Sequence, residues 1–337
     1  MLPTPIAAPK METMITKKPV SPEEIKVVEI RPRMSELDAL DRYEGKVPSV
    51  NDYDQIFESP VKLVNAHGDI VAIVVSHATK GTKPAYDAMN SYIYPSKARQ
   101  VATVGETSYV KKLDGTTSKT TQLPPHLAPL TSIGGYLDRQ SRVPYAHATM
   151  LCRDQPDKWK EMLPFIRSVD AIFKEYAPRY YEIQRSVAQE IPHDWVIGDT
   201  AFSTITMNKN FSIQYHTDKN DLKEGLGVMS CLFLGEFQNG ELVLPRYKAA
   251  LKLKHRDVVL FNVHEIHGVV PIKGAWGRFN RITVVHYLRE NLLRCGDAAH
   301  EVARGKRARH IGRLYDDEEI QLAKVRKQRA LERVNAI

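Results

Sequence analysis

The sequence predicts an α+β protein whose core is a double-stranded β-helix, or jelly roll, braced by helices. Two observations carry this prediction. Eight short runs of alternating apolar residues, separated by small turns, fill residues 199–290, and a long amphipathic helical stretch precedes them. With 42% hydrophobic residues in 337, the chain can also bury a sizeable core. A plain β-sandwich with scattered histidines is the alternative.

The N-terminal half begins irregularly. Residues 1–55 are rich in proline, lysine and glutamate, which predicts a partly disordered arm. Val61–Val64 and Ile70–Val75 flank a His67-Gly68-Asp69 turn and predict a hairpin that starts the sheet. Apolar positions three and four apart predict helices over Asp157–Ile191, divided at Pro178.

Residues 78–148 form a long segment of low regularity, which is usually functional or disordered. It interleaves basic side chains with tyrosines, a combination that suits nucleic-acid strands because cations neutralise phosphate and aromatic rings stack on bases. A solvated loop is the alternative. The residues are Lys80, Lys83, Lys97, Arg99, Lys111, Lys112, Lys119, Arg139 and Arg142, with Tyr86, Tyr92, Tyr94, Tyr109, Tyr136 and Tyr145.

The period changes from helical to strand-like at about Asp199, where the predicted jelly-roll core begins. Turn-forming residues such as Gln238-Asn239-Gly240 lie between its strands. The predicted strands are Ala201–Met207, Phe211–Thr217, Val228–Leu234, Glu241–Leu244, Ala249–Leu253, Val258–Phe261, His267–Ile272 and Ile282–Leu288.

Residues 291–337 are predicted to be a basic linker followed by a helix over Asp316–Val334. The net charge of +8 permits a polyanionic partner without requiring one. The basic run Arg304–His310 fits either a solvated, nuclear-localisation-like linker or a patch that contacts phosphates. The three scattered cysteines fit reduced thiols, and no signal peptide or membrane-spanning run is found. We therefore expect an intracellular protein, cytoplasmic or nuclear, or in the host cytoplasm if viral.

The pair His216-x-Asp218 lies at the end of a predicted strand, where residues two apart point to the same side and can reach one metal ion. His267 follows 51 residues later, at the start of a strand that a rolled barrel returns beside His216. Two histidines and one carboxylate with open positions are typical of non-haem iron oxygenases. His264 competes for the third ligand position, but Gly268 favours His267 because glycine permits close backbone approach.

Arg281 begins an otherwise apolar strand, and burying an unpaired guanidinium is very costly. A dicarboxylate co-substrate supplies the missing anion, since the planar guanidinium suits bidentate carboxylate binding. Thr283, two residues along on the same side, adds a hydroxyl. A structural salt bridge is the alternative role for Arg281.

The order His216-x-Asp218, His267-Gly268-Val269 and Arg281-x-Thr283 resembles the iron- and 2-oxoglutarate-dependent dioxygenases. More closely, the chain is similar to their TET/JBP branch, which oxidises the 5-methyl group of thymine or 5-methylcytosine in nucleic acid. Residues 199–290 carry this similarity strongly and residues 130–190 moderately. It is found in residues 208–221, 227–229, 240–247, 257–261 and 264–268, and in Gly134-Gly135-Tyr136 and Cys152-Arg153-Asp154.

The resemblance implies a dioxygenase domain over residues 56–290, with His216, Asp218 and His267 as the catalytic Fe(II) ligands. It implies that Arg281 holds the distal carboxylate of 2-oxoglutarate. Some relatives have an arginine where this chain has Phe211, so Asn208 or Asn210 becomes the candidate for the other end of the co-substrate. Asp221 matches a position that contacts the pyrimidine. An acceptor there slightly favours 5-methylcytosine, whereas a loop-capping role is the alternative.

The implied reaction couples decarboxylation of 2-oxoglutarate by O₂ to hydroxylation of a pyrimidine methyl group in DNA, with a flipped or single-stranded base. Two other classes of function are compatible with the residues. One is a 2-oxoglutarate-dependent hydroxylase of a protein or small molecule, and the other is a non-catalytic jelly-roll binding module.

Overall fold

The computed structural model describes residues 19–94, 108–111, 117–120, 130–218, 221–274, 279–307 and 313–336. The predicted nucleic-acid contacts at Lys97, Arg99 and Lys112, and the end of the basic run at residues 308–310, lie outside these ranges. Across the ranges just given, no helix is both long and apolar enough to cross a bilayer.

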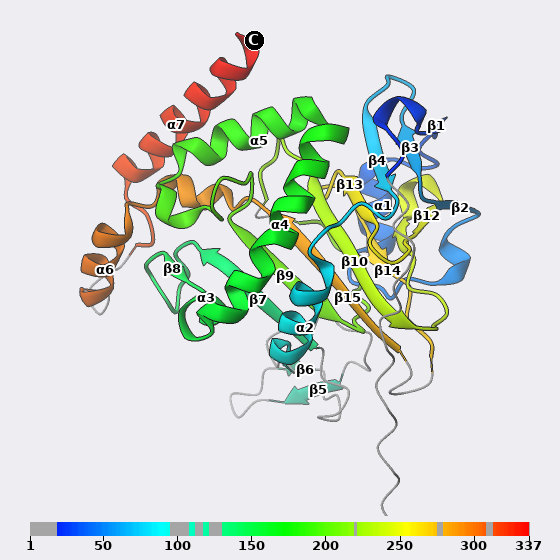
Figure 1. The fold of residues 1–337 in the computed structure, drawn as a ribbon, viewed down its shortest axis with the longest axis horizontal. Helices are drawn as coiled ribbons and strands as arrows, with labels where there is room; N and C mark the ends of the chain where they lie inside the picture. Colours follow the sequence, from blue (N-terminus) through cyan, green and yellow to red (C-terminus); the bar gives the residue numbers. More distant parts are fainter. Residues whose placement is uncertain are drawn as a thin grey trace, which may run out of the picture.

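The largest element is a sheet of nine strands in the order β1-β3-β4-β13-β10-β15-β9-β7-β8 (Figure 1). All its neighbouring pairs are antiparallel except β1 and β3. The predicted hairpin is confirmed as β3 and β4. The strands are β1 (Val27–Glu29), β3 (Val61–Val64), β4 (Ile70–Val75), β7 (Leu130–Leu137), β8 (His147–Ala148), β9 (Thr204–Lys209), β10 (Gly227–Gly235), β13 (Val258–Phe261) and β15 (Phe279–Tyr287).

A second sheet of four strands, ordered β14-β11-β12-β2, packs against the first. After β10 the chain crosses to β11 and β12, returns as β13, crosses to β14 and returns as β15. Met229 and Phe261 of one sheet share an apolar core with Leu242 and Leu251 of the other. This is the predicted double-stranded β-helix, and the fold class is confirmed. The strands are β2 (Gln55–Glu58), β11 (Leu242–Leu244), β12 (Ala249–Lys252) and β14 (Gly268–Val269).

Helices cover the outer face of the large sheet (Figure 1). The alternation of β10 explains both layers, since Met229 and Cys231 face the second sheet while Val228 and Leu232 pack against the helices. The predicted helix pair with a break at Pro178 is confirmed. The helices of this layer are α2 (Thr82–Tyr92), α3 (Met150–Asp154), α4 (Pro156–Tyr176) and α5 (Pro178–Glu190).

The C-terminal segment folds back on α5 as α6 (Ala298–Lys306) and α7 (Asp317–Asn335), which confirms the predicted terminal helix. Arg139 anchors both helices, because its guanidinium lies 2.6 Å from Glu301 and 2.7 Å from Glu319. The remaining elements are α1 (Glu36–Tyr43), the hairpin of β5 (Ser108–Lys111) and β6 (Thr117–Thr120), and the 3₁₀ turns η1 (Pro22–Glu24), η2 (Val50–Asp52), η5 (His193–Trp195), η6 (Pro245–Tyr247) and η7 (Glu290–Arg294).

Two sequence expectations differ from the structure. The strand predicted over Phe211–Thr217 is wrong, because its backbone pairs with loops instead of a ladder: Tyr215 accepts from Gly45 (2.8 Å) and donates to Lys46 (2.9 Å). Asn210 precedes this segment with a φ of 49°, which breaks the extended run. The segment 78–148 is also more regular than expected, since it includes α2, β7 and β8.

Candidate active site

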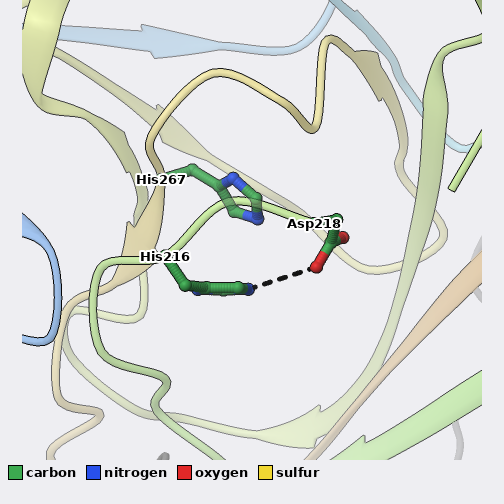
Figure 2. A group of neighbouring side chains, drawn as sticks. All are labelled: His216, Asp218 and His267. Carbon is green, nitrogen blue, oxygen red and sulfur yellow. Dashed lines mark ion pairs between the residues drawn. The ribbon is translucent and has the colours of Figure 1, made fainter. Parts of the chain in front are cut away.

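The two sheets bring His216, Asp218 and His267 together inside the jelly roll (Figure 2). One ligand atom from each lies within 4.8 Å of the others, and among the described residues no other group of three could share a metal ion. The two imidazole rings have centroids 4.4 Å apart, and Nε2 of His216 lies 3.5 Å from Oδ1 of Asp218. The predicted triad is therefore assembled in space.

Main-chain hydrogen bonds set this geometry. His216 and His267 exchange N–H···O bonds of 2.9 and 3.0 Å, and Asp218 donates its N–H to the carbonyl of Val263 at 3.0 Å. The ligands thus meet through an isolated antiparallel bridge and a loop contact, where side-chain alternation along a strand was expected. His264 points elsewhere, with Nε2 3.5 Å from the carbonyl oxygen of Leu222.

Both histidines present Nε2 to the centre of the triad. Nδ1 of His216 lies 2.8 Å from the carbonyl of Gln214, and Nδ1 of His267 lies 2.9 Å from the carbonyl of Glu265. Each carbonyl fixes its ring with the proton on Nδ1 and leaves the Nε2 lone pair for a metal. Burial, and then the neighbouring His216 ring, lowers the pKa of His267 to about 4, so its imidazole is neutral. Two histidine nitrogens and a carboxylate fit Fe(II).

The triad opens onto a cavity of about 350 Å³. Asn208, Thr283 and Asp221, all predicted from the sequence, line it, and so does Phe211. The rest of its wall is mostly apolar, with Ile213, Met229, Leu242, Phe261, Val269 and Val285. A small ring with a methyl group would find apolar contact and a few polar partners here.

Arg281 lies in an adjoining hollow together with Glu241 and Phe237. It is 2% exposed, and its Nη2 donates to the carbonyl of Gly240 at 3.1 Å. Thr283 follows on the same side of β15 and faces the metal cavity, so Arg281 stands at the end of that wall. The binding of a co-substrate carboxylate by Arg281 stays a prediction.

The two candidate asparagines differ. Asn208 lines the metal cavity, and its amide oxygen accepts a hydrogen bond from Thr131 at 2.8 Å. Asn210 uses its side-chain oxygen to accept the main-chain N–H of Arg281 at 2.7 Å, which places it in the backbone scaffold. Asn208 is therefore the better placed of the two to contact a ligand.

For Asp221 the loop-capping role is confirmed, whereas its contact with the pyrimidine stays a prediction. It lines the metal cavity, but its Oδ1 accepts the main-chain N–H groups of Leu222 (2.8 Å) and Leu288 (3.2 Å). Burial, opposed by those bonds, raises the pKa of this carboxyl well above its usual range. The Oδ1 atom of Asp221 therefore stabilises the loop that contains this residue.

Two cavity residues, Tyr287 and Arg289, were not predicted from the sequence. The pattern is visible in the sequence, because Arg281, Thr283, Val285 and Tyr287 occupy every second position of β15, and Arg289 continues this spacing two residues beyond its end. The predicted strand ended at Leu288, one residue before Arg289.

A jelly roll that brings together two histidines and one aspartate is typical of the non-haem iron oxygenases. Residues 133–290 match the Tet_JBP family, described as the oxygenase domain of the 2OGFeDO superfamily. Residues 133–290 are therefore similar to the Tet_JBP oxygenase domain, and the resemblance noted in the sequence is confirmed. The superfamily implies Fe(II) and 2-oxoglutarate.

Trypanosomatid proteins are among the relatives. The chain is 34% identical over 191 residues to the bifunctional helicase and thymine dioxygenase JBP2 of Leishmania infantum, covering 56% of this chain and 16% of that protein. It is 26% identical over 243 residues to the thymine dioxygenase JBP1 of Trypanosoma brucei brucei, covering 71% and 28%. The chain thus spans less than a third of either relative.

The solved structure of NgTET1 in complex with 5mC DNA also resembles this chain, with a TM-score of 0.47 and 11% identity over 76% of this chain and 90% of that one. A likeness at this level carries no argument about function.

Proposed function

We propose that this protein is an Fe(II)- and 2-oxoglutarate-dependent dioxygenase that hydroxylates the 5-methyl group of a pyrimidine, thymine or 5-methylcytosine, in DNA. The observation that carries the proposal is the triad of His216, Asp218 and His267 opening onto a mostly apolar cavity. When bound, iron with 2-oxoglutarate and O₂ supplies the oxidising chemistry that replaces a C–H bond by C–OH.

The protein's own residues position the reactants and keep water out. His216, Asp218 and His267 would hold the metal and leave open positions for co-substrate and oxygen. Arg281 would pair with the distal carboxylate of 2-oxoglutarate, while Thr283 and Asn208 hydrogen-bond the co-substrate from the cavity wall. Apolar side chains such as Met229 and Val285 would pack on the methyl-bearing ring.

DNA is the proposed partner for three reasons. Two relatives are named thymine dioxygenases, the chain carries a net charge of +8, and the family matched is Tet_JBP. A base stacked inside a duplex cannot reach a buried cavity, so it must be flipped or single-stranded. We assign strand contacts to the region 78–148, within a dioxygenase domain of residues 56–290. The predicted contact at Arg139 is wrong, because its buried guanidinium pairs with Glu301 and Glu319. An intracellular location, cytoplasmic or nuclear, goes with this substrate.

The test is anaerobic loading with Fe(II), followed by 2-oxoglutarate, air and DNA containing thymine and 5-methylcytosine. We expect succinate and a hydroxymethylated nucleoside, measured by mass spectrometry, and the loss of both in Asp218→Ala. Succinate formation with other substrates but no modified base would instead indicate a protein or small-molecule hydroxylase. Folded protein that binds neither iron nor 2-oxoglutarate would indicate a non-catalytic binding module.

A further inference from the structure

The wall of the metal cavity ends in a cation, Arg289, directly after β15. Its main chain forms an isolated bridge with Asp221, three residues beyond the metal-binding candidate Asp218. The side chain is 12% exposed, so this guanidinium is a fixed part of the cavity and not a surface charge. It therefore lies at the metal end of the pocket.

Two contacts hold Arg289 in place. Its Nε forms a short ion pair with Asp138, whose side chain is 5% exposed, and its main-chain N–H donates to Ser203 Oγ at 2.9 Å. Burial opposes its charge, but Asp138 and Tyr287 together raise the pKa of Arg289 above its ordinary value. The ion pair uses the Nε edge, and a guanidinium carries further N–H donors on its two Nη atoms.

An arginine in a cavity wall can only donate hydrogen bonds, so it selects ligands that present an acceptor. The charge is already balanced by Asp138, which favours a neutral carbonyl oxygen over a phosphate. Asp221, the neighbour that the sequence suggested for base choice, has one carboxyl oxygen engaged by two main-chain N–H groups. Arg289 therefore offers the cavity N–H donors on its Nη atoms that the Nε ion pair with Asp138 does not use.

The position of the reacting methyl group determines which ring substituent of the base lies next to Arg289. A methyl at C5 must face the triad, and the ring substituent next to C5 is the one at C4. At C4 thymine carries the acceptor O4, whereas 5-methylcytosine carries an amino group, which donates. An amino group facing a guanidinium leaves two donors without an acceptor, and such unpaired polar groups in a dry site are costly.

We propose that Arg289, oriented by Asp138, makes this site select thymine over 5-methylcytosine by donating a hydrogen bond to O4. The inference rests on the proposed function and narrows its substrate to one base. It also reverses the slight preference for 5-methylcytosine that Asp221 suggested from the sequence.

The experiment is a competition on one DNA molecule that carries thymine and 5-methylcytosine in the same flanking sequence. The ratio of hydroxymethyluracil to hydroxymethylcytosine is measured, because this ratio does not depend on how much enzyme is folded. We expect the wild type to favour thymine by about tenfold or more, as expected for one well-placed hydrogen-bonding partner. Arg289→Gln, whose amide both donates and accepts, should lower the ratio about tenfold.

Two further variants separate recognition from structure. Ser203→Ala removes a bond to the main chain of Arg289 but keeps its guanidinium, so the ratio should stay at the wild-type value. Asp138→Asn should lower the ratio, because it releases the guanidinium from its orientation. If Arg289→Gln does not fold, Arg289→Lys and Asp138→Asn carry the test, since both alter the donor geometry.

The outcomes distinguish the two proposals. A ratio that is unchanged in Arg289→Gln and Asp138→Asn, or a wild type that prefers 5-methylcytosine, overturns the role of Arg289 while the dioxygenase assignment stands. A wild type that modifies neither base defeats the proposed function, and this inference falls with it. Affinity of the metal-free protein for single-stranded thymine and 5-methylcytosine oligonucleotides gives a readout without turnover and should show the same preference.

Discussion

The hydroxyl of Tyr215 donates a hydrogen bond to the carboxylate of Asp52 at 3.0 Å, across 163 residues of chain. Tyr215 immediately precedes His216, and its ring also meets the ring of Tyr43 edge to face at 5.2 Å. With the main-chain bonds from Gly45 and Lys46, these contacts form a clamp on the metal-binding loop. We call Tyr43, Gly45, Lys46 and Asp52 the N-terminal clamp; these four residues lie outside the matched region 133–290.

The clamp predicts a stability effect. Asp52→Ala leaves the hydroxyl of Tyr215, which is 1% exposed, without its acceptor, and should lower the free energy of unfolding by about 1–3 kcal/mol. It should also weaken metal binding, because the segment before His216 loosens. Urea denaturation and iron titration measure the two effects. Asp54→Ala, at an exposed carboxylate nearby, is the matched control and should change stability by less than about 0.5 kcal/mol.

The carboxylates Asp218 and Asp221 should behave differently. Asp218→Asn removes an anionic ligand from the triad and should abolish stoichiometric iron binding. Asp221→Asn keeps an oxygen that can accept from Leu222 and Leu288, so the loop and the metal should be retained. The iron content of each variant is measured by mass spectrometry. Equal iron loading of both variants would show that Asp218 is not an iron ligand.

Arg281 should determine co-substrate affinity. Arg281→Met keeps much of the aliphatic volume but loses the cation, and we expect the KM for 2-oxoglutarate to rise about ten- to a hundredfold, the loss of a charged hydrogen-bonded contact. Lys273→Ala, in the same hollow, should have little effect. Should both variants keep the wild-type KM, the anion site must lie elsewhere. The KM of each variant for 2-oxoglutarate is determined from initial rates of succinate release.

His286 predicts a pH dependence of stability that is separate from catalysis. It is fully buried against Phe165 and Phe202, and burial lowers its pKa to about 3. Its unfolded pKa is near 6.5, so between about pH 6.5 and 3 the unfolded chain binds the extra proton. The stabilisation is therefore present above pH 6.5 and is lost as the pH falls.

In practice, His286→Gln should reduce the loss of stability between pH 7.5 and 5 by up to about 2 kcal/mol relative to the wild type. Urea denaturation at the two pH values measures it. His67→Gln, in an exposed turn, should leave the pH dependence unchanged. Equal pH dependence in the wild type and His286→Gln would show that His286 contributes nothing to acid sensitivity.

The elements with a strong local period were the ones that the sequence predicted. The helix pair divided at Pro178 and the hairpin Val61–Val75 follow from spacing and turn residues that act over a few positions. The triad was likewise predicted, because two histidines and a carboxylate combined with an arginine at fixed spacing form a pattern that survives small errors in the strands.

The predictions that were wrong or missing concern contacts between segments that are far apart in the sequence. The loop around Tyr215 looks like a strand by its alternation, yet its partners are Gly45 and Lys46, about 170 residues earlier. The N-terminal clamp has no period of its own, so its role could not be seen before the fold. Arg289 was missed for the opposite reason, since its alternation with Thr283 was visible and only the predicted strand end concealed it.

The placement of β4 and β2 has a practical consequence for anyone who excises the oxygenase domain. β4 pairs with β13, and β2 pairs with β12, so a fragment covering only residues 133–290 would bare the backbone of one strand in each sheet. Exposed strand edges form hydrogen bonds with strands of other molecules. This fragment should therefore aggregate, whereas the longer chain should stay in solution. Expression trials should therefore begin upstream of Val27, so that β1 at the border of the large sheet, β2 and the N-terminal clamp are all retained.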